Sequence, residues 1–278
     1  MTMPAATPGA PPKLQLDHIS HFFPAPDGGR LEVLRDISLS LNAGEFVTVI
    51  GASGSGKTSL LRIVDHLISA DEGSVLIDGK KVDGPGGKLS FVFQRDSLLP
   101  WRTVVANVSY GLELRGVPKP QARDQAQAYV DLVGLGGFER YLPHQLSGGM
   151  RQRVNLARAL AVEPDVLLMD EPFAALDAQT REMMQVELMR IWQETGKTVL
   201  FVTHQLDEAV FLADRVVVLS ARPGSVREII DIDIPRPRTI DTKRSEVFQQ
   251  YVAQLWSHIQ SDVIRDFVPQ QHAVSVSH

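Results

Sequence analysis

Apolar and polar residues alternate with a period of about two along residues 14–23 and 31–41. The turn-forming residues 24–29 separate the two segments, so we predict a pair of antiparallel strands at a sheet edge. The apolar run 45–50 follows and ends in a glycine-rich loop, after which residues 59–64 have the apolar spacing of a helix. The pattern therefore predicts a strand, a loop and a helix in immediate succession.

The rest of the chain first predicts short strands, then a mainly helical middle third, and then helices that alternate with strands. Such alternation predicts a largely parallel α/β sheet. The further strands are expected at 74–76, 89–93, 166–169, 198–203 and 215–219, with turns at Gly79 and 83–87. The helices are expected at 104–114, 121–133, 150–161, 178–195, 206–213 and 243–260, followed by a polar tail.

The composition excludes several classes of protein. The 278 residues include 28 Lys+Arg and 33 Asp+Glu, and this net charge of −5 argues against a strongly basic nucleic-acid binder. Cysteine is absent, which removes disulfides, thiolate metal sites and cysteine nucleophiles. No apolar run approaches the ~20 residues of a membrane-spanning helix. Residues 1–12 lack the pattern of a secretory signal, so we expect a flexible N-terminus.

A glycine-rich loop carries the strongest chemical signal. Residues 51–58 are Gly-Ala-Ser-Gly-Ser-Gly-Lys-Thr, which fits the phosphate-binding pattern G-x-x-x-x-G-K-[ST]. Glycines let several backbone N–H groups point at one anion, and the following helix adds the positive end of its dipole. The pattern predicts that Lys57 reaches the β and γ phosphates and that Thr58 ligates Mg2+. An ordinary glycine-rich turn is the alternative, and the preceding strand and following helix argue against it.

Two adjacent carboxylates end a predicted strand. Residues 166–169 are apolar, and Asp170 and Glu171 follow them. Open α/β sheets bind ligands at the carboxyl ends of their strands, so both acids should face the phosphate loop. We expect Asp170 to hold Mg2+, and Glu171 to orient or deprotonate the water that attacks the γ phosphate. A strand that simply ends in solvated acids would look the same, and only the phosphate loop favours the catalytic interpretation.

A third motif, Leu146-Ser-Gly-Gly149, begins a predicted helix. Ser147 is a favoured helix-capping residue, and this structural role is compatible with a functional one. Together and in this order, the motifs resemble the nucleotide-binding subunit of ATP-binding cassette (ABC) transporters over residues 14–238. Residues 51–58 resemble Walker A, Gln94 the Q-loop glutamine, residues 146–149 the family signature, Asp170 and Glu171 Walker B with its catalytic glutamate, residues 174–177 the D-loop, and His204 the switch histidine.

The resemblance implies an α/β P-loop NTPase fold, with a RecA-like core, an antiparallel β subdomain and an inserted helical subdomain. The ATP-binding domain is expected at 13–240, with its core at 13–95 and 156–240 and the helical subdomain at 96–155. Residues 241–278 would form a C-terminal helical extension and tail, and the sequence leaves open whether its helix packs on the core, contacts the partner or regulates the enzyme.

The resemblance also implies a head-to-tail homodimer that hydrolyses ATP. The signature of one copy would close over the nucleotide that is bound to the Walker A motif of the other. Asp177 would cross this interface, or would cap the next helix. The catalytic residues would be Lys57, Gln94, Glu171 and His204, and the metal ligands would be Thr58, Gln94 and Asp170. The nucleotide-binding residues would be Phe23, Gly51, Ser53, Gly54, Ser55, Gly56, Lys57, Thr58, Ser59, Gln94, Ser147, Gly148, Gly149, Asp170 and Asp177. Adenine would stack on Phe23, although Phe22 is an alternative and either ring could belong to the core.

Several segments resemble the nitrate, sulfonate and taurine importer branch of the family: Leu-Pro-Trp at 99–101, Met150, and residues 220–224 and 235–238. In this family, residues near 91–107 help to form the groove for a permease helix, where Trp101 would be either packed or exposed to the partner. Asp65-His66 replaces a small Ala-Gly pair, and the sequence gives this departure no function.

The function expected is therefore an energy-coupling ATPase subunit of an importer, with ATP and Mg2+ as cofactors. It would lie at the cytoplasmic face of the bacterial inner membrane, bound to permease subunits and indirectly served by a solute-binding protein, without nucleic acid. The alternatives are a soluble ABC ATPase without a permease and a non-hydrolysing regulatory module. The cassette does not touch its cargo, so the sequence leaves the solute open.

Overall fold

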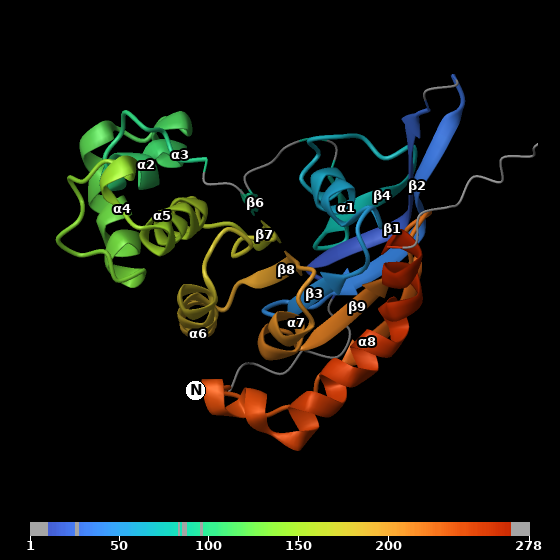
Figure 1. Ribbon diagram of the computed structural model, residues 1–278. Helices are drawn as coiled ribbons and strands as arrows, with labels where there is room; N and C mark the ends of the chain where they lie inside the picture. The colour runs from blue at the N-terminus through green and yellow to red at the C-terminus, as the bar shows by residue number, and fades with distance from the viewer. Residues whose placement is uncertain (1–10, 26–27, 83, 85–87, 95–96, 268–278) are drawn as a thin grey trace, which may run out of the picture.

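The computed structural model describes residues 11–25, 28–82, 84, 88–94 and 97–267. Its described strands form two sheets (Figure 1). One has the order β2-β1-β4-β5, and the other has the order β10-β9-β3-β8-β7-β6. The strands are β1 (Leu14–Pro24), β2 (Arg30–Leu41), β3 (Phe46–Ile50), β4 (Glu72–Ile77), β5 (Lys80–Lys81), β6 (Leu89–Val92), β7 (Val166–Asp170), β8 (Thr198–Val202), β9 (Arg215–Leu219) and β10 (Val226–Asp231).

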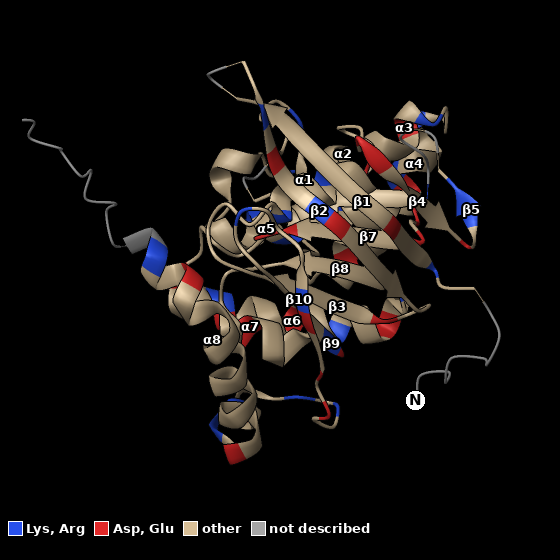
Figure 2. Cartoon of the chain, turned by 90° about the vertical axis from the view of Figure 1, so that its right-hand side faces the viewer, with Lys and Arg blue, Asp and Glu red and all other residues tan. Residues whose placement is uncertain are grey.

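Some of the helices lie against the six-stranded sheet, and others form a separate group at one side of it (Figure 1). They are α1 (Lys57–Val64), α2 (Val104–Val108), α3 (Tyr110–Leu114), α4 (Lys119–Leu132), α5 (Gly148–Ala161), α6 (Ala178–Thr195), α7 (Leu206–Leu212) and α8 (Glu246–Phe267), with 3-10 turns η1 (Pro143–Gln145) and η2 (Ile240–Arg244). Helices α2, α3, α4 and α5 pack on one another, whereas α8 contacts α7 and β9 (Figures 1 and 2). No helix in the described ranges is long and apolar enough to cross a bilayer.

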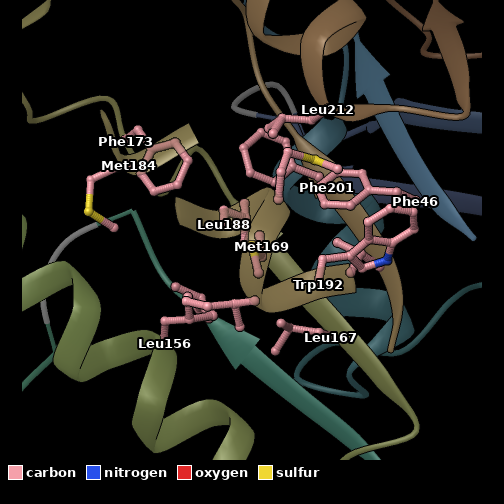
Figure 3. Close-up of a cluster of buried hydrophobic side chains, with 14 of the residues drawn as sticks. Phe46, Leu156, Leu167, Met169, Phe173, Met184, Leu188, Trp192, Phe201 and Leu212 are labelled. Carbon is pink, nitrogen blue, oxygen red and sulfur yellow. The ribbon is translucent and has the colours of Figure 1, made fainter. Parts of the chain in front are cut away.

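Strands β3, β7 and β8 are buried along their whole length, as expected for parallel strands covered on both faces. Their side chains alternate between two cores because successive residues of a strand point to opposite faces. Phe46 and Phe201 join the core beneath α5, α6 and α7, where the Trp192 ring meets Phe46 edge-on at 5.7 Å (Figure 3). Val47 and Val49 join the core between the sheets, beside α1. The two cores therefore hold the sheet rigid at its centre.

The structure confirms the main elements predicted from the pattern, and it corrects several details. The antiparallel pairing of β1 with β2 and the parallel pairing of β9, β3, β8, β7 and β6 are as expected. The helix expected over 104–114 is two helices, and the last helix begins at Glu246 rather than at residue 243. Strands β5 and β10 were not predicted. The expected flexible N-terminus and polar tail fall mostly outside the described residues, as does most of the turn at 83–87.

Candidate nucleotide-binding site

The glycine-rich loop joins the buried strand β3 to helix α1 at the carboxyl edge of the parallel sheet. The Nζ atom of Lys57 donates to the carbonyl oxygens of Gly51 and Ala52 at 2.8 and 3.0 Å, so the loop curls around its own lysine. Lys57 is only 8 % exposed. Burial lowers the pKa of its ammonium, and the nearby carboxylates Glu171 and Asp170 act in the opposite direction. A buried ammonium at this position is well suited to an anionic ligand.

Gly56 caps the start of α1 with a backbone φ of 86°, in the left-handed region that glycine adopts without steric cost. A Cβ atom at this position would also lie 2.6 Å from Cδ2 of Leu34, a buried residue of β2. Any side chain here would therefore strain the backbone and push the loop away from β2. Both constraints explain why the loop needs glycine at this position.

A threonine and an aspartate meet at the entrance to α1. The Thr58 hydroxyl donates to Oδ1 of Asp170 at 3.1 Å. Burial raises the pKa of the Asp170 carboxyl, and the hydrogen bond from Thr58 opposes this rise. Hydroxyl and carboxylate oxygens are the ligands that Mg2+ prefers, and the cation is commonly held by one or two such groups together with substrate phosphates. The donor set therefore fits Mg2+.

Three polar side chains meet where neighbouring strands end. Glu171 follows β7, and its Oε2 atom accepts a hydrogen bond from Nε2 of Gln94, after β6, at 3.3 Å. The same oxygen lies 3.0 Å from Nδ1 of His204, which follows β8. The backbone of Glu171 adopts a φ of 43°, and its N–H donates to the carbonyl of Val202 at 2.9 Å. This left-handed backbone conformation ends the β7 hydrogen-bond ladder and directs the Glu171 carboxylate toward the phosphate loop. Such sparsely populated backbone conformations are common at functional sites.

The phosphate loop opens into a cavity of about 810 Å3. Most of the residues that the sequence predicts for the phosphate loop and its surroundings line this cavity. Four further lining residues were not assigned to the site from the sequence: Leu31, Glu32, Val33 and Arg222. The lining residues are Phe23, Leu31, Glu32, Val33, Ser53, Gly54, Gly56, Lys57, Thr58, Ser59, Glu171, His204 and Arg222. Residues 220–224 had been noted only as a resemblance to one branch of the family, so Arg222 had a signal in the sequence but no role.

The two candidate aromatic rings differ in their surroundings. Phe23 is 40 % exposed, lines the cavity and contacts the His21 ring edge-on at 4.8 Å. Phe22 does not line the cavity, and the Arg30 guanidinium covers its ring at 4.3 Å. The geometry favours Phe23 as the ring that is available to a ligand.

The signature and D-loop residues lie away from this cavity and close to each other. The Ser147 hydroxyl accepts from the N–H of Met150 at 3.3 Å and caps α5, and Asp177 accepts from the N–H of Thr180 at 3.0 Å and caps α6. A Cβ atom on Gly149 would lie 2.9 Å from Cγ2 of Thr180, so the starts of the two helices are packed together. Figure 1 shows α5 among α2, α3 and α4, apart from α1. The capping alternatives are therefore present in the structure, and neither motif lines the cavity of its own chain.

Known proteins share this combination of fold and phosphate loop. The model of the ABC transporter family matches residues 34–174. An ABC transporter ATP-binding protein of Methanocaldococcus jannaschii is 50 % identical over 253 residues, which cover 91 % of this chain and 93 % of that protein. This chain belongs to the ABC transporter family. Its fold is that of an ABC ATPase, and the enzyme hydrolyses ATP.

Relatives of this ABC ATPase have more specific names. The taurine import ATP-binding protein of Escherichia coli K12 is 48 % identical over 218 residues, 78 % of this chain and 85 % of that protein. The nitrate import ATP-binding protein of Synechocystis is 46 % identical over 229 residues, 80 % of this chain and 86 % of that protein. Among solved structures, the dimeric ATP-binding cassette MJ0796 bound to ADP and Pi superposes with a TM-score of 0.69 at 31 % identity, covering 80 % of this ABC ATPase and all of MJ0796.

Proposed function

We propose that this ABC ATPase is the energy-coupling subunit of an importer for a small solute of the taurine or nitrate kind. The relatives named as taurine and nitrate import proteins support the solute class. The observation that carries the proposed chemistry is the convergence of Gln94 and His204 on one oxygen of Glu171, beside the phosphate loop. Gln94 and His204 follow different strands, so the sheet itself holds the three groups together.

In this proposal the N–H groups of the loop bind the phosphates of ATP, and Lys57 bridges the β and γ phosphates. Its ammonium already lies at the loop carbonyls of Gly51 and Ala52, so little side-chain order is lost on binding. Phe23 stacks on adenine, which its exposed ring on the cavity wall supports. The remaining loop contacts are proposed for Ser53, Gly54, Ser55, Gly56 and Ser59.

Thr58 and Asp170 would hold Mg2+, with Gln94 as a third ligand. When bound, the cation would neutralise charge on the phosphate oxygens. Glu171 would orient or deprotonate the attacking water, and His204 would hold the γ phosphate in line. Phosphoryl transfer depends mainly on positioning and charge stabilisation, so a preassembled set of donors at a rigid sheet edge is the feature that such catalysis needs.

The second half of each site would come from another copy of the chain. Ser147, Gly148 and Gly149 lie outside the cavity of their own chain, at the start of α5, where Ser147 is exposed and Gly149 is buried. A helix N-terminus binds anions through its free N–H groups and its dipole. In a head-to-tail homodimer these groups would close over the γ phosphate of the other copy, and Asp177 would lie at the interface. The dimeric structures of the MJ0796 cassette support this assembly.

A separate groove between the sheet and the helical group is proposed to receive the permease. Phe91 and Phe93 stack in it at 4.3 Å, and Leu114 and Asp65 also line it. Trp101 does not line this groove, but it is 74 % exposed, which supports an interface role over that of a packed core aromatic. Exposed apolar surface of this kind is typical of a protein interface. The enzyme would therefore be a peripheral protein at the cytoplasmic face of the inner membrane, and a solute-binding protein would act through the permease without nucleic acid.

The expected domain boundaries are retained as part of the proposal: core at 13–95 and 156–240, helical subdomain at 96–155, and C-terminal extension from 241. The boundary between residues 155 and 156 lies inside the continuous helix α5, so the helical group and the core are linked there by an unbroken helix. Movement of the signature relative to the core would then be transmitted as movement of this whole helix.

The decisive experiment is purification of the wild-type chain and of Lys57→Ala, each with ATP and Mg2+, followed by phosphate release and capture of membrane proteins. The wild type should release phosphate and retain a multi-span membrane protein, and Lys57→Ala should bind ATP poorly. Hydrolysis without any membrane partner would favour the soluble ABC ATPase. Unchanged ATP affinity in Lys57→Ala would contradict the proposed division of roles.

A further inference from the structure

The loop between β9 and β10, residues 220–225, is tied to the edge of the antiparallel sheet. The N–H of Gly224 donates to the carbonyl of Val33 at 2.9 Å, and the N–H of Arg35 donates back to the carbonyl of Gly224 at 2.9 Å. Within the loop, the Ser220 hydroxyl accepts from the N–H of Ser225 at 3.0 Å and donates to the carbonyl of Pro223 at 3.0 Å. These bonds fix the backbone of the loop on both sides.

The same loop lies directly against the phosphate loop. A Cβ atom on Gly224 would overlap the backbone carbonyl of Ser55, so the two backbones approach as closely as glycine allows. At Gly54 a Cβ atom would lie 3.5 Å from Nε and 3.6 Å from Nη2 of Arg222. The guanidinium therefore stands in van der Waals reach of the phosphate loop, on the wall of the cavity that also contains Lys57.

Helix α8 holds this loop from the other side. Asp262 is 4 % exposed, and its Oδ2 atom accepts from the N–H of Ala221 at 3.3 Å and from Nη2 of Arg227 at 2.7 Å. Arg227 lies on β10 and also donates to the carbonyl of His258, one turn earlier on α8. Removal of one partner of a buried ion pair is strongly destabilising. Through Asp262, helix α8 contacts both β10 and the residue that precedes Arg222.

We infer that Arg222 binds the phosphate chain of the nucleotide, and that the C-terminal helix positions it there through Asp262. This inference rests on the proposed ATP site. In the described ranges, the cavity is lined by two carboxylates and two cations: Glu32 bonds to Arg35 at 2.9 Å, Glu171 lies beside Gln94 and His204, and Lys57 and Arg222 supply the positive charge. A guanidinium presents a planar fork of donors that matches phosphate oxygens, and its place beside Gly54 is on the phosphate side of the cavity.

The first experiment compares full-length wild type, Arg222→Gln, Arg222→Lys and Arg244→Gln for affinity to ADP and to a non-hydrolysable ATP analogue. Arg244 is an exposed control that removes the same charge far from the cavity, where it pairs with Asp241. Loss of a charged hydrogen bond should weaken binding of both nucleotides by about tenfold to a hundredfold in Arg222→Gln. Arg222→Lys should recover part of the affinity, and Arg244→Gln should match the wild type. In steady-state assays of Arg222→Gln, the KM for ATP should rise while kcat stays within about twofold of the wild-type value.

Affinity of Arg222→Gln within twofold of the wild type, for both nucleotides, would overturn the assignment. Lys57→Ala is included so that this failure is separable from failure of the site itself. A wild type that binds, with Lys57→Ala impaired and Arg222→Gln unaffected, rejects only the role of Arg222. A wild type that binds no nucleotide rejects the proposed function.

The role of α8 is tested with Asp262→Asn alone and in combination with Arg222→Gln, on samples whose folding is verified by circular dichroism. If Asp262 acts by positioning Arg222, Asp262→Asn should weaken nucleotide binding severalfold in the wild-type chain and cause no further loss in Arg222→Gln. Equal losses in both backgrounds would show that Asp262 acts independently of Arg222 and would overturn the link. If Asp262→Asn does not fold, Arg227→Lys is compared with Ser257→Ala. Arg227→Lys weakens the ion pair with Asp262. Ser257→Ala is the control, because the Ser257 hydroxyl, on the same helix, donates to the carbonyl of Gln254 instead. Arg227→Lys should then weaken binding and Ser257→Ala should not, and the opposite result would reject the link.

Discussion

Asp65 carries an unfavourable charge that a single substitution removes. It caps the carboxyl end of α1, where the helix dipole disfavours an anion, and no ion pair reaches its carboxylate among the residues that the structure describes. Burial raises the pKa of this carboxyl from 3.8 to about 6. A group whose pKa rises on folding destabilises the fold wherever the unfolded chain holds it ionised. Replacement of Asp65 by Asn should therefore stabilise the protein at neutral pH.

The magnitude follows from the pKa. A rise from 3.8 to about 6 corresponds to about 3 kcal/mol when the carboxyl is fully ionised, and solvent screening at this partly exposed position reduces it to about 1–2 kcal/mol. The direction of the pH dependence follows from proton binding. The folded state binds the Asp65 proton more tightly than the unfolded chain does, so the cost of ionised Asp65 to the free energy of folding grows as the pH rises. It is nearly complete above about pH 7, about half as large at pH 5 and small below about pH 4.

The assay is thermal unfolding of wild type and Asp65→Asn at pH 7.5 and at pH 5. A gain of about 1–2 kcal/mol should raise the Tm by roughly 2–8 °C at pH 7.5 and by about half as much at pH 5. Asp124→Asn, at an exposed position on α4, removes the same charge and should change the Tm little. A gain that is equal at the two pH values, or a loss at pH 7.5, would refute the burial argument. Because Asp65 lines the proposed permease groove, the stabilised variant should also retain less of the membrane partner.

Three other predictions separate the proposed roles. Glu171→Gln should bind ATP normally and accumulate a nucleotide-bound dimer while phosphate release falls by roughly a hundredfold or more; normal turnover would remove Glu171 from the chemistry. Gly224→Ala should displace the phosphate loop, since its Cβ overlaps the carbonyl of Ser55, and should lower both ATP affinity and Tm; an unchanged nucleotide titration would show that the loop yields without cost. Phe23→Ala should raise the Kd for ATP by about fivefold or more and Phe22→Ala should not, as measured by calorimetry, and the reverse order would exchange the two rings.

The sequence predicted the fold well where local patterns were strong. The run of residues 45–50 and its glycine-rich loop specified β3, the loop and the start of α1, because a buried parallel strand is continuously apolar and glycine is needed where φ is positive. The break at Ser109 was not visible, since its buried hydroxyl bonds to Glu113 and the carbonyl of Ala106 only once the helices have formed. Strand β10 was missed because four of its six residues are exposed and it alternates poorly.

The candidate site was predictable only as far as its residues lie in motifs. Gln94, Glu171 and His204 follow consecutive strands of the sheet, so their convergence follows from parallel topology. Arg222 and Glu32 could not be placed, because they reach the cavity through a pairing of residues nearly 200 positions apart, Leu34 with Gly224. No local pattern encodes such a contact. The family resemblance covered the proposed catalytic residues, and it included residues 220–224 without giving them a role in the site.

The arrangement of polar groups also agrees with the proposal that turnover needs two copies of the chain. Lys57, Glu171 and His204 lie at a sheet edge that two apolar cores support, whereas the start of α5 lies outside the cavity, packed beside Leu176 and Thr180. A single chain can therefore bind the triphosphate on one side and leave the other side in water, where stabilisation of developing charge is weak. A second copy that covers the γ phosphate with Ser147 and Gly149 would exclude that water and strengthen every contact. Closure and catalysis would then occur together, which is the property that an energy-coupling subunit requires.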